Sequence, residues 1–271
     1  MEKKQLNHGI NSYFHKKDKE SADIVEAACE KCIPKIKEIL GLPMPEKCSV
    51  YLATSYINFI FFIIPFPLVF IMAFILPLYY FRGRRVWQWA AGLCYSSEKK
   101  IIIGVKPLWL LEKSDKSLGE KIYVKIPELQ NYLEHIICHE MAHAFCSFLK
   151  LPSWINEGMA MMTAEQYYGV ATVKKETLQS LDPSAKESYF KKYPDLSGVK
   201  KKYFYRYVLG YWFVKYLLEK HPEFLREMLE KKEKQKTIKE KIASELDISL
   251  DDFYRELHQK LFKHFQTQAD G

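Results

Sequence analysis

The chain has 271 residues, of which 48% are hydrophobic, so it is long enough to bury one sizeable core. Its formal net charge of +8 is spread over many lysines and is not collected in one block. This distribution argues against a nucleic-acid-binding surface and favours a solvated surface with some attraction to anionic lipid.

We expect residues 1–47 to form a tail and one amphipathic helix. Residues 1–21 are polar and rich in lysine, and they lack the apolar stretch of a cleavable signal peptide. Residues 21–40 carry apolar side chains at helical spacing, and Pro34 is predicted to kink or split this helix.

Cys29 and Cys32 form a C-x-x-C pair in that helix. No second pair follows at zinc-knuckle spacing, and no strand precedes the pair as in a thioredoxin-type site. We therefore interpret them as two ordinary buried or half-exposed cysteines. The remaining cysteines show no disulfide pattern, which favours a reducing compartment.

Residues 48–54 combine β-branched and aromatic side chains and are expected to form a strand. The chain then carries no charged residue over residues 59–81, and Arg82 follows at once. A membrane-spanning helix needs about 20 apolar residues, so the length suffices for one crossing. The alternative is a buried core helix, but an apolar run of this length is too long to be buried easily in a domain of this size. We expect residues 59–81 to contact membrane lipid.

Three prolines, and the position of the segment directly after the first strand, indicate how residues 59–81 would enter the membrane. Pro65, Pro67 and Pro77 would break or kink a helix. A single span would also place the strand at residues 48–54 on the opposite side of the bilayer from the rest of the domain. A re-entrant apolar hairpin that dips into one leaflet fits best, and a true span is the second interpretation.

Short strands and loops are expected next. Residues 100–105 read as a strand, residues 108–119 as a loop and residues 121–124 as a further short strand. Residues 86–92 are expected to be a loop that leads into the strand at residues 100–105, and this strand could be a sheet edge or an ordinary core strand.

The most informative stretch is His139-Glu140-Met141-Ala142-His143, inside a segment with helical periodicity. A helix places His139 and His143 on one face, where both imidazoles can reach one ion. In an H-E-x-x-H arrangement two histidines bind zinc and the glutamate acts as general base. Such a pentapeptide also arises by chance, in a helix that carries two histidines for no catalytic reason. Its context raises the odds of metal binding, because Pro152 ends the helix and a second helix can bring Glu157 back as a third ligand.

The histidine motif, followed by Pro-Ser-Trp-Ile-Asn-Glu-Gly-Met-Ala at residues 152–160, resembles the gluzincin metallopeptidases, the superfamily of thermolysin. The likeness is closest to the peptidase MA-like branch, with its W-x-x-E-G-x-A box. It implies that His139, His143 and Glu157 bind Zn²⁺ and that Glu140 is the base. Glu157 follows the second histidine more closely than in gluzincin aminopeptidases, and no G-x-M-E-N box is found, so the resemblance does not extend to aminopeptidase activity, and the choice between endo- and exopeptidase stays open.

The resemblance implies an α+β fold over residues 48–271. We expect a zincin-like domain with a small mixed sheet over the H-E-x-x-H helix and a mainly helical C-terminal part. The apolar membrane-inserting segment at residues 59–81 would lie between the first strand and the sheet edge. In this family the strand that corresponds to residues 100–105 is the edge along which substrate lies extended.

The C-terminal part is predicted to be mainly helical. Residues 200–221 carry a stripe of aromatic side chains that we interpret mostly as core packing. Tyr207 could present its hydroxyl to the developing oxyanion, as related enzymes require such a donor. Residues 231–241 read as a solvated charge run, and residues 249–252 as the N-terminus of the last helix, which extends to about residue 265.

These features predict a membrane-associated zinc metallopeptidase with a peptide or protein substrate, with membrane lipid bound through residues 59–81 and with no nucleic-acid partner. We expect it at the cytoplasmic membrane, with the catalytic domain on the cytoplasmic side. One alternative is a non-catalytic, membrane-associated binding protein with a vestigial zinc site. Another is an enzyme that acts on a lipid-linked or membrane-protein substrate.

Overall fold

The computed structural model describes residues 1–64, 76–97 and 100–267. Contacts divide the chain into two compact units. The first unit comprises Met1–Gly119 and Lys125–Phe145, and the second comprises Glu120–Val124 and Cys146–Gly271. Helices make up 64% of the structure, and a five-stranded mixed sheet lies in the first unit.

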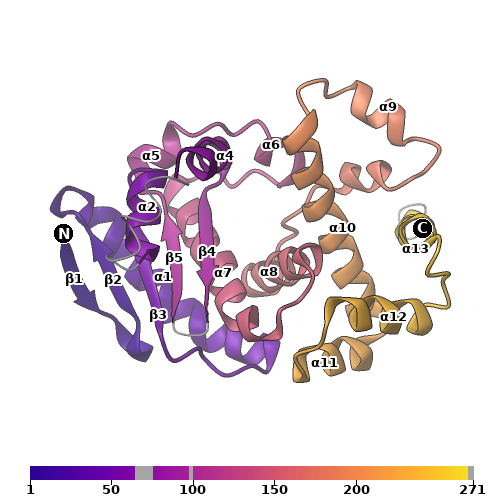
Figure 1. The fold of residues 1–271 in the computed structure, drawn as a ribbon, viewed down its shortest axis with the longest axis horizontal. Helices are drawn as coiled ribbons and strands as arrows, with labels where there is room; N and C mark the ends of the chain where they lie inside the picture. Colours follow the sequence, from indigo (N-terminus) through magenta and orange to yellow (C-terminus); the bar gives the residue numbers. More distant parts are fainter. Residues whose placement is uncertain (65–75, 98–99, 268–271) are drawn as a thin grey trace. The chain divides into compact units, whose positions relative to one another are not determined.

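The sheet of the first unit has the strand order β1-β2-β3-β5-β4, so that β1 and β4 are its edges (Figure 1). Its strands are β1 (Glu2–Gln5), β2 (Asn11–Phe14), β3 (Cys48–Leu52), β4 (Gly92–Ser96) and β5 (Ile101–Val105). The pairs β2–β3 and β3–β5 are parallel, and the two outer pairs are antiparallel. Every residue of β5 is buried, which explains its continuous apolar sequence.

Helix α1 (Lys19–Leu40) is the longest helix of the first unit. Its apolar face is buried, and Pro34 lies inside the helix without ending it. The helix ends at Gly41, whose φ of 66° is left-handed and whose N–H donates to the carbonyl oxygen of Lys37. Glycine adopts this conformation at little cost, which makes it a common residue at helix C-termini. The other helices that begin in this unit are α2 (Tyr56–Ile63), α4 (Leu76–Trp89), α5 (Leu108–Glu112), α6 (Gly119–Ile122) and α7 (Leu129–Cys146).

The predicted fold class, an α+β zincin-like domain with an inserted apolar membrane segment at residues 59–81, is wrong. The structure is mostly helical with a small sheet, and among the described residues no helix is long and apolar enough to cross a membrane. Helix α2 has only eight residues, far fewer than the about 20 that a crossing needs. It ends at the extended Ile64, because the proline that follows disfavours helical geometry there. Residues 65–75, on which much of this prediction falls, lie outside the described part of the chain.

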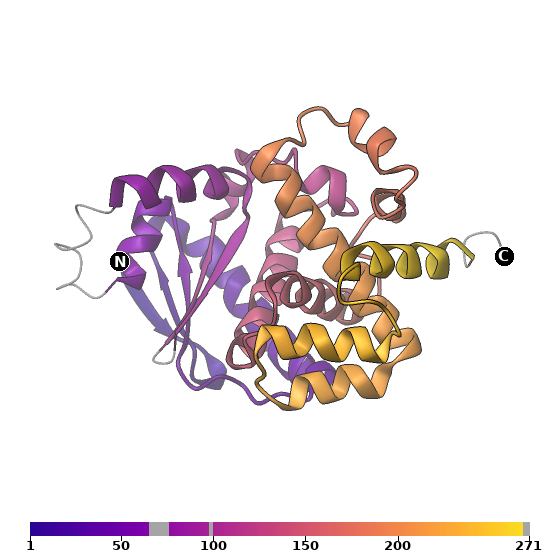
Figure 2. The ribbon, with the colours of Figure 1, turned by 45° about the vertical axis from the view of Figure 1, so that its right-hand side comes forward.

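The beginning of the same apolar run is used in the core of the first unit. Phe59 and Ile60 of α2 are buried, and Phe59 stacks on Trp87 of α4 with ring centroids 6.1 Å apart. Phe59, Trp87, Tyr51, Ala53 and Ile102 form one hydrophobic cluster. Helices α2 and α4 accordingly lie side by side (Figure 2). Within the described residues, the charge-free run thus contributes Phe59 and Ile60 to a protein core, while Phe61 is 46% exposed.

Several local predictions also need correction. Residues 1–21 contain the antiparallel pair β1–β2, where we had expected only a tail. Residues 86–89 belong to helix α4 and residues 108–112 form α5, where loops were predicted. Of residues 121–124, where a strand was expected, Lys121 and Ile122 end helix α6, and Tyr123 forms one isolated bridge with Val173.

The second unit is helical, apart from that single bridge in its described residues. Its helices are α8 (Ser153–Tyr168), α9 (Lys186–Lys191), α10 (Gly198–Lys220), α11 (Pro222–Glu230), α12 (Gln235–Glu245) and α13 (Phe253–Thr267). Helix α10 is its centre, since Phe204, Phe213 and Leu217 of this helix are fully buried. Figure 1 shows α8 and α10 crossing at close range. The helices predicted at residues 200–221 and 252–265 are confirmed as α10 and α13.

Candidate metal centre

Helix α7 positions the two histidines of the H-E-x-x-H motif. Its apolar side chains recur at helical spacing, and Leu133, Ile137 and Met141 are fully buried. Because that face is packed, the orientation of the helix is fixed. His139 and His143 lie one turn apart on a different face. Their ring centroids are 4.7 Å apart and their planes are nearly perpendicular, at 89°. Two imidazoles are therefore presented together, as the sequence predicted.

Glu157 lies on α8, the helix that follows the break at Pro152. One ligand atom from each of His139, His143 and Glu157 lies within 4.8 Å of the others. Zinc–ligand bonds are about 2.0–2.2 Å long, so two ligands of one ion lie up to about 4.2 Å apart. Among the described residues this is the one such group of His, Cys, Asp and Glu.

Glu140, the predicted base, is also on α7 and is 6% exposed. Its carboxylate lies against Gly92, the first residue of the edge strand β4. The resemblance implied that residues 100–105 are a sheet edge, and the sequence itself left an ordinary core strand open; these residues form the interior strand β5. The edge strand β4 follows a stretch interpreted as loop, and its sequence, Gly-Leu-Cys-Tyr-Ser, lacks the alternation of apolar and polar residues that would have indicated a strand.

His135 is a residue of α7 that the sequence reading overlooked. It precedes His139 by one helical turn, so the histidines at positions 135, 139 and 143 share one face. Burial, and then the neighbouring His139, lower the pKa of His135 to about 4. Its imidazole is therefore neutral at pH 7. The signal that could have found it is the four-residue spacing, repeated once before the motif.

Tyr207, the candidate oxyanion donor, lies in α10. Its ring contacts those of Tyr123 and Tyr203, with centroids 6.1 and 6.3 Å away. These contacts describe packing within the second unit. A role for the Tyr207 hydroxyl in chemistry stays a prediction.

Two glycines hold α8 close to α10 beside Glu157. A Cβ atom at Gly158 would lie 2.1 Å from the carbonyl oxygen of Gly210, and one at Gly210 would lie 1.9 Å from that of Trp154. Neither position admits a side chain without moving a backbone. The predicted metal ligand Glu157 is thus followed directly by Gly158, which makes the close contact between the two helices.

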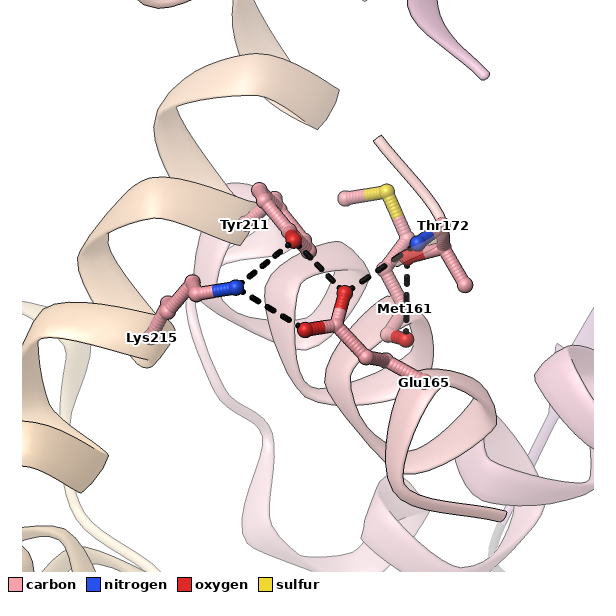
Figure 3. A network of polar contacts seen from close by, with 5 residues as sticks. All are labelled: Met161, Glu165, Thr172, Tyr211 and Lys215. Atoms are coloured by element: carbon pink, nitrogen blue, oxygen red, sulfur yellow. Dashed lines mark hydrogen bonds and ion pairs between the residues drawn. The ribbon is translucent and has the colours of Figure 1, made fainter. Parts of the chain in front are cut away.

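A polar network fixes the same two helices farther along (Figure 3). Glu165 of α8 accepts hydrogen bonds from Lys215 Nζ at 2.9 Å, from Tyr211 Oη at 2.6 Å and from the Thr172 N–H at 3.1 Å. Burial, and then the hydrogen bond to Glu165, raise the pKa of Tyr211 well above its ordinary value. Tyr211 therefore stays protonated and acts as a donor. Sequence reading missed this network because its members lie up to 50 positions apart.

The cysteines show no disulfide in the described structure. Cys29 and Cys32 are buried and free, as expected. Cys138, next to His139, is fully buried. A hydrogen bond with Cys32 and burial both raise the pKa of the Cys138 thiol, so it is protonated and unreactive at neutral pH.

The chain was also compared with known proteins. No family model matches it, and no curated protein or solved structure does either. Support for a function therefore comes from the residues themselves and from their geometry.

Proposed function

We propose that this protein is a zinc-dependent metallopeptidase that hydrolyses peptide bonds. One observation carries the proposal: the ligand atoms of His139, His143 and Glu157 lie within 4.8 Å of one another. Two imidazoles and one carboxylate form a common ligand set of catalytic zinc, which keeps a fourth position open for water. The order H-E-x-x-H followed by W-x-x-E-G-x-A, which resembles the gluzincin pattern, agrees with it.

The residues suit this chemistry. Zinc held by the three ligands would supply a Lewis acid and lower the pKa of a water molecule toward neutrality. Glu140 would accept the proton of the attacking water and pass it to the leaving amine as the peptide bond breaks. Because Glu140 is almost fully buried, its carboxylate has little freedom to leave this position.

The edge strand β4 supports a peptide as substrate. It pairs with β5 on one side and is the last strand in the sheet order, so within the described residues its other side pairs with no strand. An extended peptide can add to such an edge through main-chain hydrogen bonds. Gly92, which begins this strand, lies beside Glu140, so a peptide bound there would run past the proposed base.

The test measures zinc content and peptide-library cleavage for the purified chain, with and without a chelator. Glu140→Gln should retain zinc and lose hydrolysis by a factor on the order of 10² or more, because the amide cannot accept the proton. His143→Ala should lose both. Glu134→Gln, a control glutamate on the same helix, should retain both. Full cleavage by Glu140→Gln would show that this residue is not the base, and cleavage unaffected by chelation would refute the metal-dependent mechanism.

A further inference from the structure

Gly92 and Glu140 make the closest approach at the proposed base. A methyl group at position 92 would place its carbon 2.7 Å from Cγ and from Oε1 of Glu140, and 3.0 Å from Cδ. These separations are far below ordinary van der Waals contact between carbon atoms. Only a residue without a side chain fits between the strand backbone and the Glu140 side chain as they stand.

The strand has little room to retreat. Gly92 is in register with Val105 of the interior strand β5, and Val105 is fully buried. The N–H of Lys106 donates to the carbonyl oxygen of Ala91 at 3.3 Å, immediately before the strand. Moving Gly92 outward would therefore break the antiparallel ladder at its first pair.

The glutamate has little room either. Glu140 is 6% exposed, and its helical neighbours Met141 and Ala142 are fully buried. Because the close contact involves Cγ as well as the carboxylate, turning the carboxylate alone does not relieve it. The whole side chain would have to leave its rotamer, and with it the proposed base would leave its place.

We propose that Gly92 is a positioning residue: its missing side chain leaves the space that the Glu140 side chain occupies, and its backbone holds the carboxylate in one orientation. The catalytic consequence rests on the proposed function, in which Glu140 is the base. The contact itself does not depend on that function and can be tested separately.

A double-mutant cycle tests the contact without any measurement of activity. Gly92→Ala should lower the Tm by about 2–10 °C in the wild-type background, the range for an overpacked site. In a Glu140→Ala background it should change the Tm little, because Glu140→Ala removes Cγ, Cδ and Oε1 together. An equal loss in both backgrounds would overturn the proposal, as would no loss in either.

Gly104→Ala is the matched control on the neighbouring strand. A Cβ atom at Gly104 would lie 2.3 Å from the ring of Phe59, with no atom of Glu140 among its nearest neighbours. Its effect on the Tm should therefore be the same with and without the Glu140 side chain. A Glu140-dependent effect at both glycines would indicate general loosening of the sheet and would count against a specific contact.

Activity provides the second measurement. Gly92→Ala should lower kcat for peptide cleavage on the order of 100-fold while KM and zinc content stay near wild type, because only the base is displaced. An unchanged kcat would overturn the positioning role. If the wild-type chain cleaves no peptide, the proposed function fails, and the Tm cycle still decides whether Gly92 holds Glu140.

Discussion

At the scale of single residues, Lys106 shows how a cation is kept inside the first unit. It follows β5 directly and is 2% exposed. Its ammonium group donates to Ser114 Oγ at 2.8 Å and to the Gln88 carbonyl oxygen at 3.3 Å, and it lies 5.3 Å from the ring centroid of Trp87. These contacts join the segment after β5 to helix α4. Burial lowers the pKa of Lys106 to about 8, although Asp115 opposes that effect.

This lowered pKa predicts a pH dependence of stability. An unfolded lysine titrates near pH 10.4, so between about pH 8 and pH 10 the unfolded chain binds more protons at Lys106 than the folded chain. The contribution of Lys106 to folding stability should therefore rise with pH across this window. Lys106→Met should abolish that contribution, which the difference in Tm between variant and wild type at pH 7.5 and pH 9.5 measures. A difference that is the same at both pH values would contradict the prediction.

At the scale of elements, the contact between α8 and α10 explains why glycine follows Glu157. The two helices touch backbone to backbone at Gly158 and Gly210, where a Cβ atom on either side would meet a carbonyl oxygen. Glu157 therefore lies on a helix whose distance from α10 depends on having glycine at these two positions. Trp154, one turn earlier on α8, packs on Phe213 of α10 with ring centroids 4.8 Å apart.

Gly210→Ala should therefore destabilise the protein more than its gain in helix propensity stabilises it. Overpacking costs about 1–3 kcal/mol, whereas replacing a helical glycine by alanine gains about 1 kcal/mol. Lys202→Ala on an exposed position of the same helix should change stability by at most about 0.5 kcal/mol. Denaturant unfolding of the two variants measures the comparison. A Gly210→Ala variant as stable as wild type would show that the two helices can separate freely.

At the scale of the whole molecule, the sequence predicted features that depend on neighbouring residues and failed for features that depend on residues far apart in the chain. The periodicity around His139 and His143 and the break at Pro152 are short-range features, and helices α7 and α8 follow them closely. The membrane segment predicted at residues 59–81 fails in its described part, where α2 is too short to span, because the absence of charge indicates only that a segment avoids water. Whether lipid or protein covers it depends on distant residues such as Trp87, which packs on Phe59.

The edge strand β4 escaped prediction for a related reason. A strand is defined by its partner, and Gly92–Ser96 pairs with a segment that follows it in the chain. The short-range pattern of residues 92–96 is weak, since Gly92 has low strand propensity and the edge is half-exposed. The contact between Gly92 and Glu140 joins residues far apart in the chain, so it could be found only in the folded structure.

Metal removal should be visible in the stability of the whole chain. A ligand that binds only the folded protein stabilises it by about 4 kcal/mol at a free concentration of 1,000 times its Kd. Added zinc should therefore raise the Tm of the apo protein by several degrees, and a chelator should reverse the change. His139→Ala should abolish the response, while His15→Ala should leave it intact. A zinc-induced rise in Tm that survives His139→Ala would place the ion elsewhere.

Glu165 accepts hydrogen bonds from three donors, and this constrains which substitutions can accumulate at these positions. Replacing that carboxylate alone would remove the acceptor of the half-buried Lys215 ammonium and of the buried Tyr211 hydroxyl. Exchange of Lys215 alone would leave a carboxylate without its countercharge. Descendants of this chain should therefore keep positions 165, 211 and 215 as a set or change them together, even where the surrounding surface diverges.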